Sequence, residues 1–517
     1  MRPPCDQAAI AALPAESPCT RSDAPWILTA AILGSSIAFI DSTVVNVALP
    51  ALQATFRASV VDVQWVVEGY ALFLAALILV GGSLGDLYGR RRVFVTGVAL
   101  FATSSAWCGV ARTIHELILA RCAQGVGAAL LVPGSLAIIS ASFEEKRRGA
   151  AIGTWSGATA ITMAIGPVLG GWLIEHASWR WAFFINLPIA LAVILICWWH
   201  VPESKNPDAA ELDWRGALSV TIGLAGLTYG LIEAPRFGWA SSPVILSLAV
   251  GILALAIFVV VEQRERSPMV PLTLFRSRTF AGANLLTLFL YSAIGVFFFL
   301  FPLNLIQVQG YSATAAGAAG LPAIVLLFLL SRWSGGLVAR YGAHLPLIVG
   351  PLVVAVGFAL FTIPSVGGSY WRTFFFPYVV LGFGMAISIA PLTTVVMNSI
   401  GAGRAGVASG VNNAVARTAG LLAVAVIGIV ILHAFQSGLA SSSALKSAPR
   451  EVREQVLANS IDLAATPIPP AAEPQQVPQL KKVIDDSFLS AFCLVMWICA
   501  GLAVLSSIMA ARWIGEP

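Results

Sequence analysis

The chain has 517 residues, of which 58% are hydrophobic and only 11% are charged, and its mean hydropathy is +0.85. An average soluble protein is about 25% charged, so this composition excludes a soluble protein and predicts an integral membrane protein. The formal net charge of +5 is modest and requires no nucleic-acid partner.

The first 25 residues are rich in Pro and Ala, and they lack the basic start and short apolar core of a signal peptide. We expect residues 1–25 to form a disordered cytoplasmic tail. A bilayer core about 30 Å thick needs roughly 20 apolar residues per helix, and fourteen later segments meet this requirement, which predicts an all-α membrane protein. The predicted spans are Trp26–Leu49, Trp65–Gly85, Val93–Val110, Glu116–Ser140, Gly149–Ile174, Trp181–Val201, Gly216–Ile232, Val244–Val261, Phe280–Leu305, Ala313–Val338, Leu345–Ile363, Phe374–Met397, Ala405–His433 and Phe488–Met509.

Three ionisable residues lie inside predicted spans of the N-terminal half: Asp41, Glu68 and Arg121. A carboxylate within a membrane helix costs roughly 2.5–3.5 kcal/mol on insertion scales and is functional by default. At 1.5 Å per residue, all three lie within about 12 Å of the outer ends of their helices, so we expect them to interact and to couple protons. The alternatives are a structural hydrogen bond for Asp41, an interfacial acid for Glu68 and a static bond from Arg121 to a backbone carbonyl.

Between the second and third spans, residues Gly82–Arg92 read GSLGDLYGRRR. This pattern predicts a Gly-rich cytoplasmic hinge. An Asp at a helix end bonds to N-terminal amides or to Arg and can hold one conformation closed, which predicts a conformational latch. Its residues are Gly82, Asp86, Gly89 and Arg90. Alternatively, the arginines only determine topology.

A related segment, Gly335–Gly342, reads GGLVARYG and has Ala339 in place of the Asp. It also lies between two apolar spans, so it is interpreted as a degenerate copy of the first motif. Transporters often consist of two such halves.

The fifth predicted span contains Gly166, Pro167, Gly170 and Gly171. Proline interrupts helical hydrogen bonding and small residues permit a neighbouring helix to approach. We therefore predict a broken or kinked hinge helix, with a simple packing kink as the alternative.

The thirteenth predicted span places Asn412, Asn413 and Arg417 in its inner half to middle. Together with Gln124 of the fourth span, these polar residues are predicted to line a cavity. Pairing between helices is the alternative.

Residues 435–486 are rich in Ala, Ser, Pro and Gln and predict a partly disordered outer loop, with a short helix near Glu451–Asn459. With the N-terminus inside, the cytoplasmic segments hold 17 of the 30 Lys and Arg residues, and the short outer loops hold five. This asymmetry predicts that both termini are cytoplasmic.

Several segments, in the expected order, together resemble the major facilitator superfamily, in particular its fourteen-span drug/proton antiporter branch (QacA/EmrB type). The resemblance implies that the first-span Asp takes part in proton or cation coupling and that the fourth-span Arg contributes. It also implies that the fifth-span motif is associated with antiporters. The segments that carry it are Ile40–Pro50, Gly82–Arg92, Arg121–Ala129, Gly166–Gly171, Trp179–Pro188 and Arg404–Gly420.

The resemblance also implies a domain organisation with two six-helix bundles and two extra central helices. The bundles are expected at residues 26–201 and 280–517, the extra helices within 202–262, and a cytoplasmic linker at 263–279.

The expected function is proton-coupled secondary active export of apolar or cationic drug-like molecules by alternating access. No GxxxxGK[ST] motif occurs, which excludes a P-loop ATP site, so we expect a proton gradient as the energy source, with no cofactor, no metal and no enzymatic activity. The alternatives are a dedicated exporter of one endogenous metabolite, such as an antibiotic or siderophore, and a non-transporting receptor or scaffold.

The expected partners are a small-molecule substrate, protons and the lipid bilayer. We expect a functional monomer in the inner (cytoplasmic) membrane of a bacterium. The resemblance also allows a periplasmic adaptor protein.

Overall fold

The computed structural model describes residues 23–206, 211–400 and 405–515, and in these ranges the backbone is almost entirely helical, with no β-strand. Thirteen helices of the described residues are long and apolar enough to cross a bilayer. A fourteenth apolar helix, His344–Leu360, is shorter. Each coincides with one predicted span, so the all-α membrane fold is confirmed.

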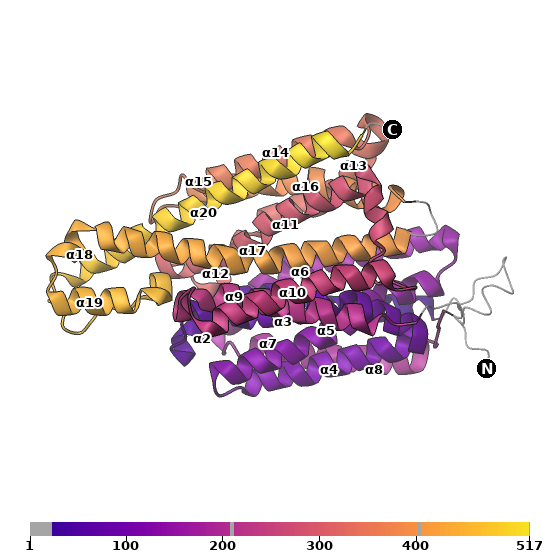
Figure 1. Ribbon diagram of the computed structural model, residues 1–517, viewed down its shortest axis with the longest axis horizontal. Helices are drawn as coiled ribbons and strands as arrows, with labels where there is room; N and C mark the ends of the chain where they lie inside the picture. The colour runs from indigo at the N-terminus through magenta and orange to yellow at the C-terminus, as the bar shows by residue number, and fades with distance from the viewer. Residues whose placement is uncertain (1–22, 207–210, 401–404, 516–517) are drawn as a thin grey trace. The chain divides into compact units, whose positions relative to one another are not determined.

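The first half of the chain forms the helices shown in indigo to magenta in Figure 1. They are α2 (Ala24–Phe56), α3 (Val60–Tyr88), α4 (Arg90–Val110), α5 (Ile114–Ser142), α6 (Glu145–His176), α7 (Trp181–Phe184), α8 (Asn186–His200), α9 (Trp214–Phe237) and α10 (Ser242–Arg264).

The second half forms the helices that run from pink to yellow in Figure 1. They are η1 (Leu272–Arg276), α11 (Arg278–Leu303), η2 (Asn304–Val308), α12 (Ala313–Ala319), α13 (Leu321–Tyr341), α14 (His344–Leu360), α15 (Tyr370–Thr373), α16 (Phe375–Asn398), α17 (Ala405–Ser441), α18 (Ser443–Ser447), α19 (Arg450–Ala458), η4 (Ser460–Ala465) and α20 (Val477–Trp513).

The helices group into two compact units. The N-terminal unit contains the described residues within 1–45, 66–226 and 249–273. The C-terminal unit contains those within 46–65, 227–248 and 274–517. Several helices are therefore divided, with one part of the helix assigned to each unit.

In the N-terminal unit, α4 packs against α5 through glycines. A Cβ at Gly127 would lie 2.6 Å from the Phe101 backbone nitrogen, and one at Gly97 would lie 2.8 Å from the Leu131 nitrogen. Small residues at such crossings let helix backbones approach closely, which is the usual packing mode of membrane helices.

In the C-terminal unit, α20 runs beside α14 and also packs against α11 (Figure 1). The core of the C-terminal unit contains a cluster of buried aromatic rings from α11 and the helices next to it. The centroids of Phe297 and Phe361 are 4.8 Å apart, and those of Phe301 and Tyr378 are 5.2 Å apart. Such aromatic pairs add to the stability that burial of their area gives.

The predicted Gly-rich hinge at Gly82–Arg92 is wrong in its extent. Helix α3 continues to Tyr88 and α4 begins at Arg90, so Gly89 is the only residue between them. Its φ of 114° is a conformation that glycine adopts without a Cβ penalty. In the related segment, Gly342 with φ 74° follows α13 in the same way.

The predicted loop at 435–486 is wrong at both ends, because α17 continues to Ser441 and α20 begins at Val477. These extensions bury apolar residues such as Phe435, Leu439 and Leu480, while the rest of their surface is polar. This mixture dilutes the apolar signal that marks a span. The predicted short helix is confirmed as α19, and it packs with η4 and α17.

Helix α6 runs without interruption from Glu145 to His176, through Pro167. The fifth span was predicted to be broken or kinked, and the predicted break is wrong. A proline within a membrane helix is tolerated when local adjustments satisfy the backbone groups that it frees.

Candidate functional site

The candidate site is a buried ion pair in the N-terminal unit. Asp41 of α2 is fully buried, and Arg121 of α5 is 1% exposed. The Arg121 Nη1 atom donates to Asp41 Oδ2 at 2.5 Å, and Nε donates to the Val66 carbonyl at 3.0 Å. The guanidinium carbon also lies 4.3 Å from the ring centroid of Tyr70. The sequence left two alternatives for Arg121, an interaction with an acidic residue and a bond to a backbone carbonyl, and the structure shows both.

Gln124, one helical turn after Arg121, completes the contacts between these two side chains. Its Oε1 accepts from Arg121 Nη1 at 2.6 Å, and its Nε2 donates to Asp41 Oδ1 at 2.8 Å. Its side chain is fully buried. The structure therefore places Gln124 inside the ion-pair network.

Two further residues of this network were missed by sequence reasoning. Asn186, at the start of α8, donates to Asp41 Oδ1 at 3.4 Å and to Ser105 Oγ at 3.0 Å. Asn186 belongs to the WRWAFFINLP segment that carries the family resemblance, and a polar residue there was an available signal. Ser105, in the second half of α4, offered none.

The chemistry of this network depends on the charge of Asp41. Hydrogen bonds and an adjacent guanidinium stabilise a carboxylate. Protonation of Asp41 would leave Arg121 as a buried charge without its counter-ion, which is costly.

Glu68 is 1% exposed on α3, and no described residue bonds to its Oε2 atom. No hydrogen bond or ion pair of the described residues joins it to Asp41 or Arg121. Among the described residues, hydrogen bonds therefore join two of the three predicted coupling residues, Asp41 and Arg121, and do not include Glu68. A buried carboxylate without a partner is costly when ionised.

The latch residues lie at the end of α3, at Gly89 and at the start of α4. Asp86 Oδ1 accepts from Arg90 at 3.0 Å (Nε) and 2.7 Å (Nη2). A Cβ on Gly82 would make only an ordinary contact with Pro133. The closest approach is one residue earlier, because a Cβ on Gly81 would overlap the Ala129 carbonyl.

Glu203 is a partner of this motif that sequence reasoning missed. It follows α8, and its Oε1 and Oε2 atoms accept from the backbone nitrogens of Arg91 (3.0 Å) and Arg92 (3.2 Å). A carboxylate at the N-terminus of α4 is favourable because the free amides there carry partial positive charge. The Arg90 amide also donates to the Ser204 carbonyl at 2.8 Å.

The glycines of α6 lie against α2. A Cβ on Gly166 would overlap the Thr43 hydroxyl, and one on Gly170 would lie 2.5 Å from Val44. Gly171 is buried, and Pro167 lies within the continuous helix. This face of α6 therefore contacts the helix that carries Asp41.

The polar residues of α17 lie in the C-terminal unit. Asn412 donates to Thr287 Oγ1 at 2.7 Å and to Asn284 Oδ1 at 3.2 Å, both on α11. Asn413 is exposed and bonds to the Ser409 carbonyl, and Arg417 is half-buried. Asn412 thus pairs between helices, which was the alternative to its cavity role.

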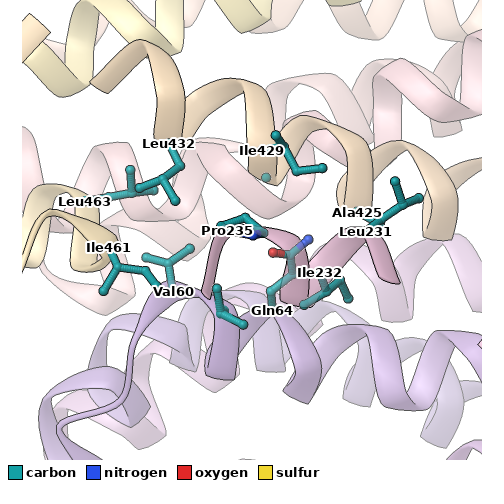
Figure 2. Close-up of a pocket in the computed structure, with 12 residues that line it drawn as sticks. Val60, Gln64, Leu231, Ile232, Pro235, Ala425, Ile429, Leu432, Ile461 and Leu463 are labelled. Carbon is teal, nitrogen blue, oxygen red and sulfur yellow. The ribbon is translucent and has the colours of Figure 1, made fainter. Parts of the chain in front are cut away.

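A small pocket in the C-terminal unit lies among the ends of α3 and α9, helix α17 and η4 (Figure 2). Its only polar side chain is that of Gln64, which donates to the Val424 carbonyl at 3.0 Å. The remaining lining is apolar and includes Ile232, Ile429 and Leu463. None of the predicted site residues lines it.

Within the described ranges, no group of three His, Cys, Asp or Glu side chains is placed to hold a metal ion.

A sequence model of the family described as Major Facilitator Superfamily matches residues 31–425. The Multidrug resistance protein Stp of Mycobacterium tuberculosis is 36% identical over 444 residues, which cover 85% of this chain and 82% of that protein. The Tetracenomycin C resistance and export protein of Streptomyces glaucescens is 31% identical and covers 94% of this chain and 91% of its own length.

Among solved structures, a bacterial homologue of the human lysosomal transporter Spinster, in an inward-facing, unoccupied conformation, aligns with a TM-score of 0.66. It is 17% identical, and the alignment covers 96% of this chain and all of that one. This similarity supports the fold alone.

Proposed function

The chain belongs to the major facilitator superfamily, and from this premise we propose that it exports drug-like or antibiotic molecules in exchange for protons. The relatives named for multidrug resistance and for tetracenomycin C export support this substrate class. The observation that carries the proton coupling is the buried ion pair of Asp41 with Arg121. The expected absence of enzymatic activity belongs to the same proposal.

In this proposal, Asp41 is the group that binds the proton. Its two oxygens accept from Arg121 and Gln124 while it is ionised. Neutral Asp41 loses its attraction for Arg121, and α2 and α5 become free to adopt a second arrangement. Alternating access couples this exchange to substrate passage between two bundles, residues 26–201 and 280–517.

Other residues support the conformational exchange. The proposed latch consists of Gly82, Asp86, Gly89 and Arg90. Glu203, in the segment after α8, stabilises it by accepting a hydrogen bond from the Arg91 amide. Gly166, Pro167, Gly170 and Gly171 form the proposed hinge surface against α2. Glu68 is a second proposed proton carrier, and Asn413 and Arg417 are proposed to line the substrate path.

The proposed setting is the inner membrane of a bacterium with both termini in the cytoplasm. We propose a functional monomer whose partners are the substrate, protons and lipids. An adaptor protein in the periplasm is an additional proposed partner.

A dedicated exporter of one metabolite is the second candidate function, favoured by the 31% identity to a protein named for a single antibiotic. Expression in an efflux-deficient host distinguishes the two. Resistance to many unrelated compounds supports the multidrug proposal, whereas resistance confined to one chemical class supports the dedicated exporter.

The coupling proposal is tested in proteoliposomes with an imposed pH gradient. The substrate is a compound to which the protein confers resistance. We expect Asp41→Asn to lower gradient-driven transport at least about tenfold, because the ionised state and its pair with Arg121 no longer exist. Glu175→Gln, which changes an exposed acid on α6, is the matched control and is expected to transport normally. Full wild-type exchange by Asp41→Asn would refute the coupling role.

A further inference from the structure

Two buried carboxyl groups meet where α9 begins and α10 ends, within the N-terminal unit. Asp213 is 4% exposed and Glu262 is 3% exposed. The Asp213 Oδ1 atom accepts from the Gly216 amide at 2.7 Å and so caps α9. Glu262 Oε2 accepts from the Val270 amide at 3.0 Å, in the segment that follows α10. Each carboxyl group thus uses one oxygen to position the backbone.

The other oxygen of each group has no hydrogen-bond donor among the described residues: these are Asp213 Oδ2 and Glu262 Oε1. Both face the same point beside Gly216. A Cβ on that glycine would lie 3.0 Å from Glu262 Oε1 and still closer to Asp213 Oδ2. The two side chains are within hydrogen-bonding reach of each other.

Among the described residues, no positively charged side chain (Lys, Arg or His) is paired with either carboxylate. The nearby Glu265 adds a further negative charge, and Arg215, Arg264 and Arg266 are exposed.

Two like charges buried at this separation cannot both persist, and carboxyl pairs of this kind share one proton. We propose that Asp213 and Glu262 bind a single proton between Oδ2 and Oε1. One bridging proton supplies the donor that both orphaned oxygens lack and removes one of the two negative charges.

The bound proton holds three elements together: the start of α9, the end of α10 and the segment that leads to η1. Helices α9 and α10 lie side by side along their length (Figure 1), with Gly223 packed against Leu255. Loss of the proton places two repelling charges at the junction. The pair is therefore a proton-binding site separate from Asp41, and it stands or falls independently of the proposed transport function.

The test uses the full-length protein in detergent. Infrared difference spectra between wild type and Glu262→Gln, recorded at neutral pH, are expected to show a protonated carboxyl C=O band present only in the wild type. Asp213→Asn is expected to remove the same band. A Gln at position 262 mimics the protonated Glu, since its amide donates to Asp213 Oδ2 and its oxygen accepts from the Val270 amide.

Thermal unfolding gives a second measurement over a range from about pH 5 to pH 9. We expect the wild-type melting temperature to fall by about 2–4 °C more than that of Glu262→Gln as the pH rises. Glu211→Gln changes an exposed acid two residues before Asp213 and is expected to follow the wild type. The proposal would be overturned if the wild type and Glu262→Gln had identical carboxyl bands and their melting temperatures changed equally with pH. A melting temperature that rises with Mg²⁺ or Ca²⁺ in the wild type only would also overturn it, because the ligand would then be a cation.

Discussion

The two oxygens of the Asp41 carboxylate accept from different donors, and only some of these donors could be predicted from the sequence. Oδ2 accepts from Arg121. Asp41 and Arg121 were both predicted as site residues because ionisable side chains are rare in membrane helices. Oδ1 accepts from Gln124 and Asn186. Asn186 lies in a segment that carries the family resemblance, so the sequence marked its position, but only the tertiary arrangement identifies its contact with Asp41.

The ion pair predicts a difference between two substitutions of the same residue. Asp41→Ala leaves the buried Arg121 without its counter-ion, and removal of one member of a buried pair costs about 3–5 kcal/mol. Asp41→Asn retains an oxygen that accepts from Arg121, so we expect a smaller loss. Thermal unfolding of the purified variants measures the order, and equal melting temperatures would contradict the role assigned to the pair.

The backbone conformation and surroundings of Gly89 leave no room for a side chain. Its φ is 114°, and a Cβ there would lie 2.5 Å from Glu203 Oε1. We expect Gly89→Ala to lower stability by about 1–3 kcal/mol through backbone strain, in addition to displacing Glu203. Gly149→Ala is the matched control, because this glycine of α6 has open space around it, and alanine favours a helix by up to about 1 kcal/mol. Melting temperatures that shift in the same direction would argue against the constraint.

At the scale of elements, the positions of the helices were predictable and several of their ends were not. Long apolar runs identified every span, including α9, whose Glu233 and Tyr229 dilute its apolar character. The ends of α17 and α20 escaped prediction because those turns are amphipathic and are stabilised by packing against each other and against α18, α19 and η4. Helical stability in proteins arises mostly from such packing.

The stability of η4 is expected to depend on pH because this element contains Asp462, a partly buried acid. Burial and the neighbouring charge of Asp62 raise the pKa of Asp462 to about 6 from an ordinary value of 3.8. Because the pKa is higher in the folded protein, the stabilising contribution is complete below about pH 4 and is lost as the pH rises through about 6. We expect amides of residues 460–466 to exchange more slowly at pH 5 than at pH 7.5, after correction for intrinsic rates.

The matched variants for this experiment are Asp462→Asn and Glu473→Gln. Asp462→Asn removes the titrating group, so its corrected exchange rates are expected to be equal at the two pH values. Glu473 is exposed, and Glu473→Gln is expected to retain the wild-type pH difference. A pH difference that survives in Asp462→Asn would assign the effect to another group.

At the scale of the whole molecule, the sequence repeat has a structural counterpart. Gly89 and Gly342 each follow a membrane helix with positive φ and each stand just before the next helix. The charged residue was lost from the second copy, where Ala339 replaces the Asp. The proposed latch, which uses a carboxylate, is therefore expected only in the first copy, whereas the positive φ of the glycine is common to both.

The distribution of positive charge predicts the topology of the whole chain. Seventeen of the 30 Lys and Arg residues fall in segments assigned to the cytoplasm, against five in the short outer loops, and such an excess marks the cytoplasmic side. An even number of spans then places both termini inside and the α18–η4 segment outside. An epitope inserted after Glu473 is expected to bind antibody on intact spheroplasts, whereas a C-terminal epitope is expected to require permeabilisation. Labelling of the C-terminal epitope on intact spheroplasts would reverse the orientation, and it would place the arginines after Gly89 on the outer face.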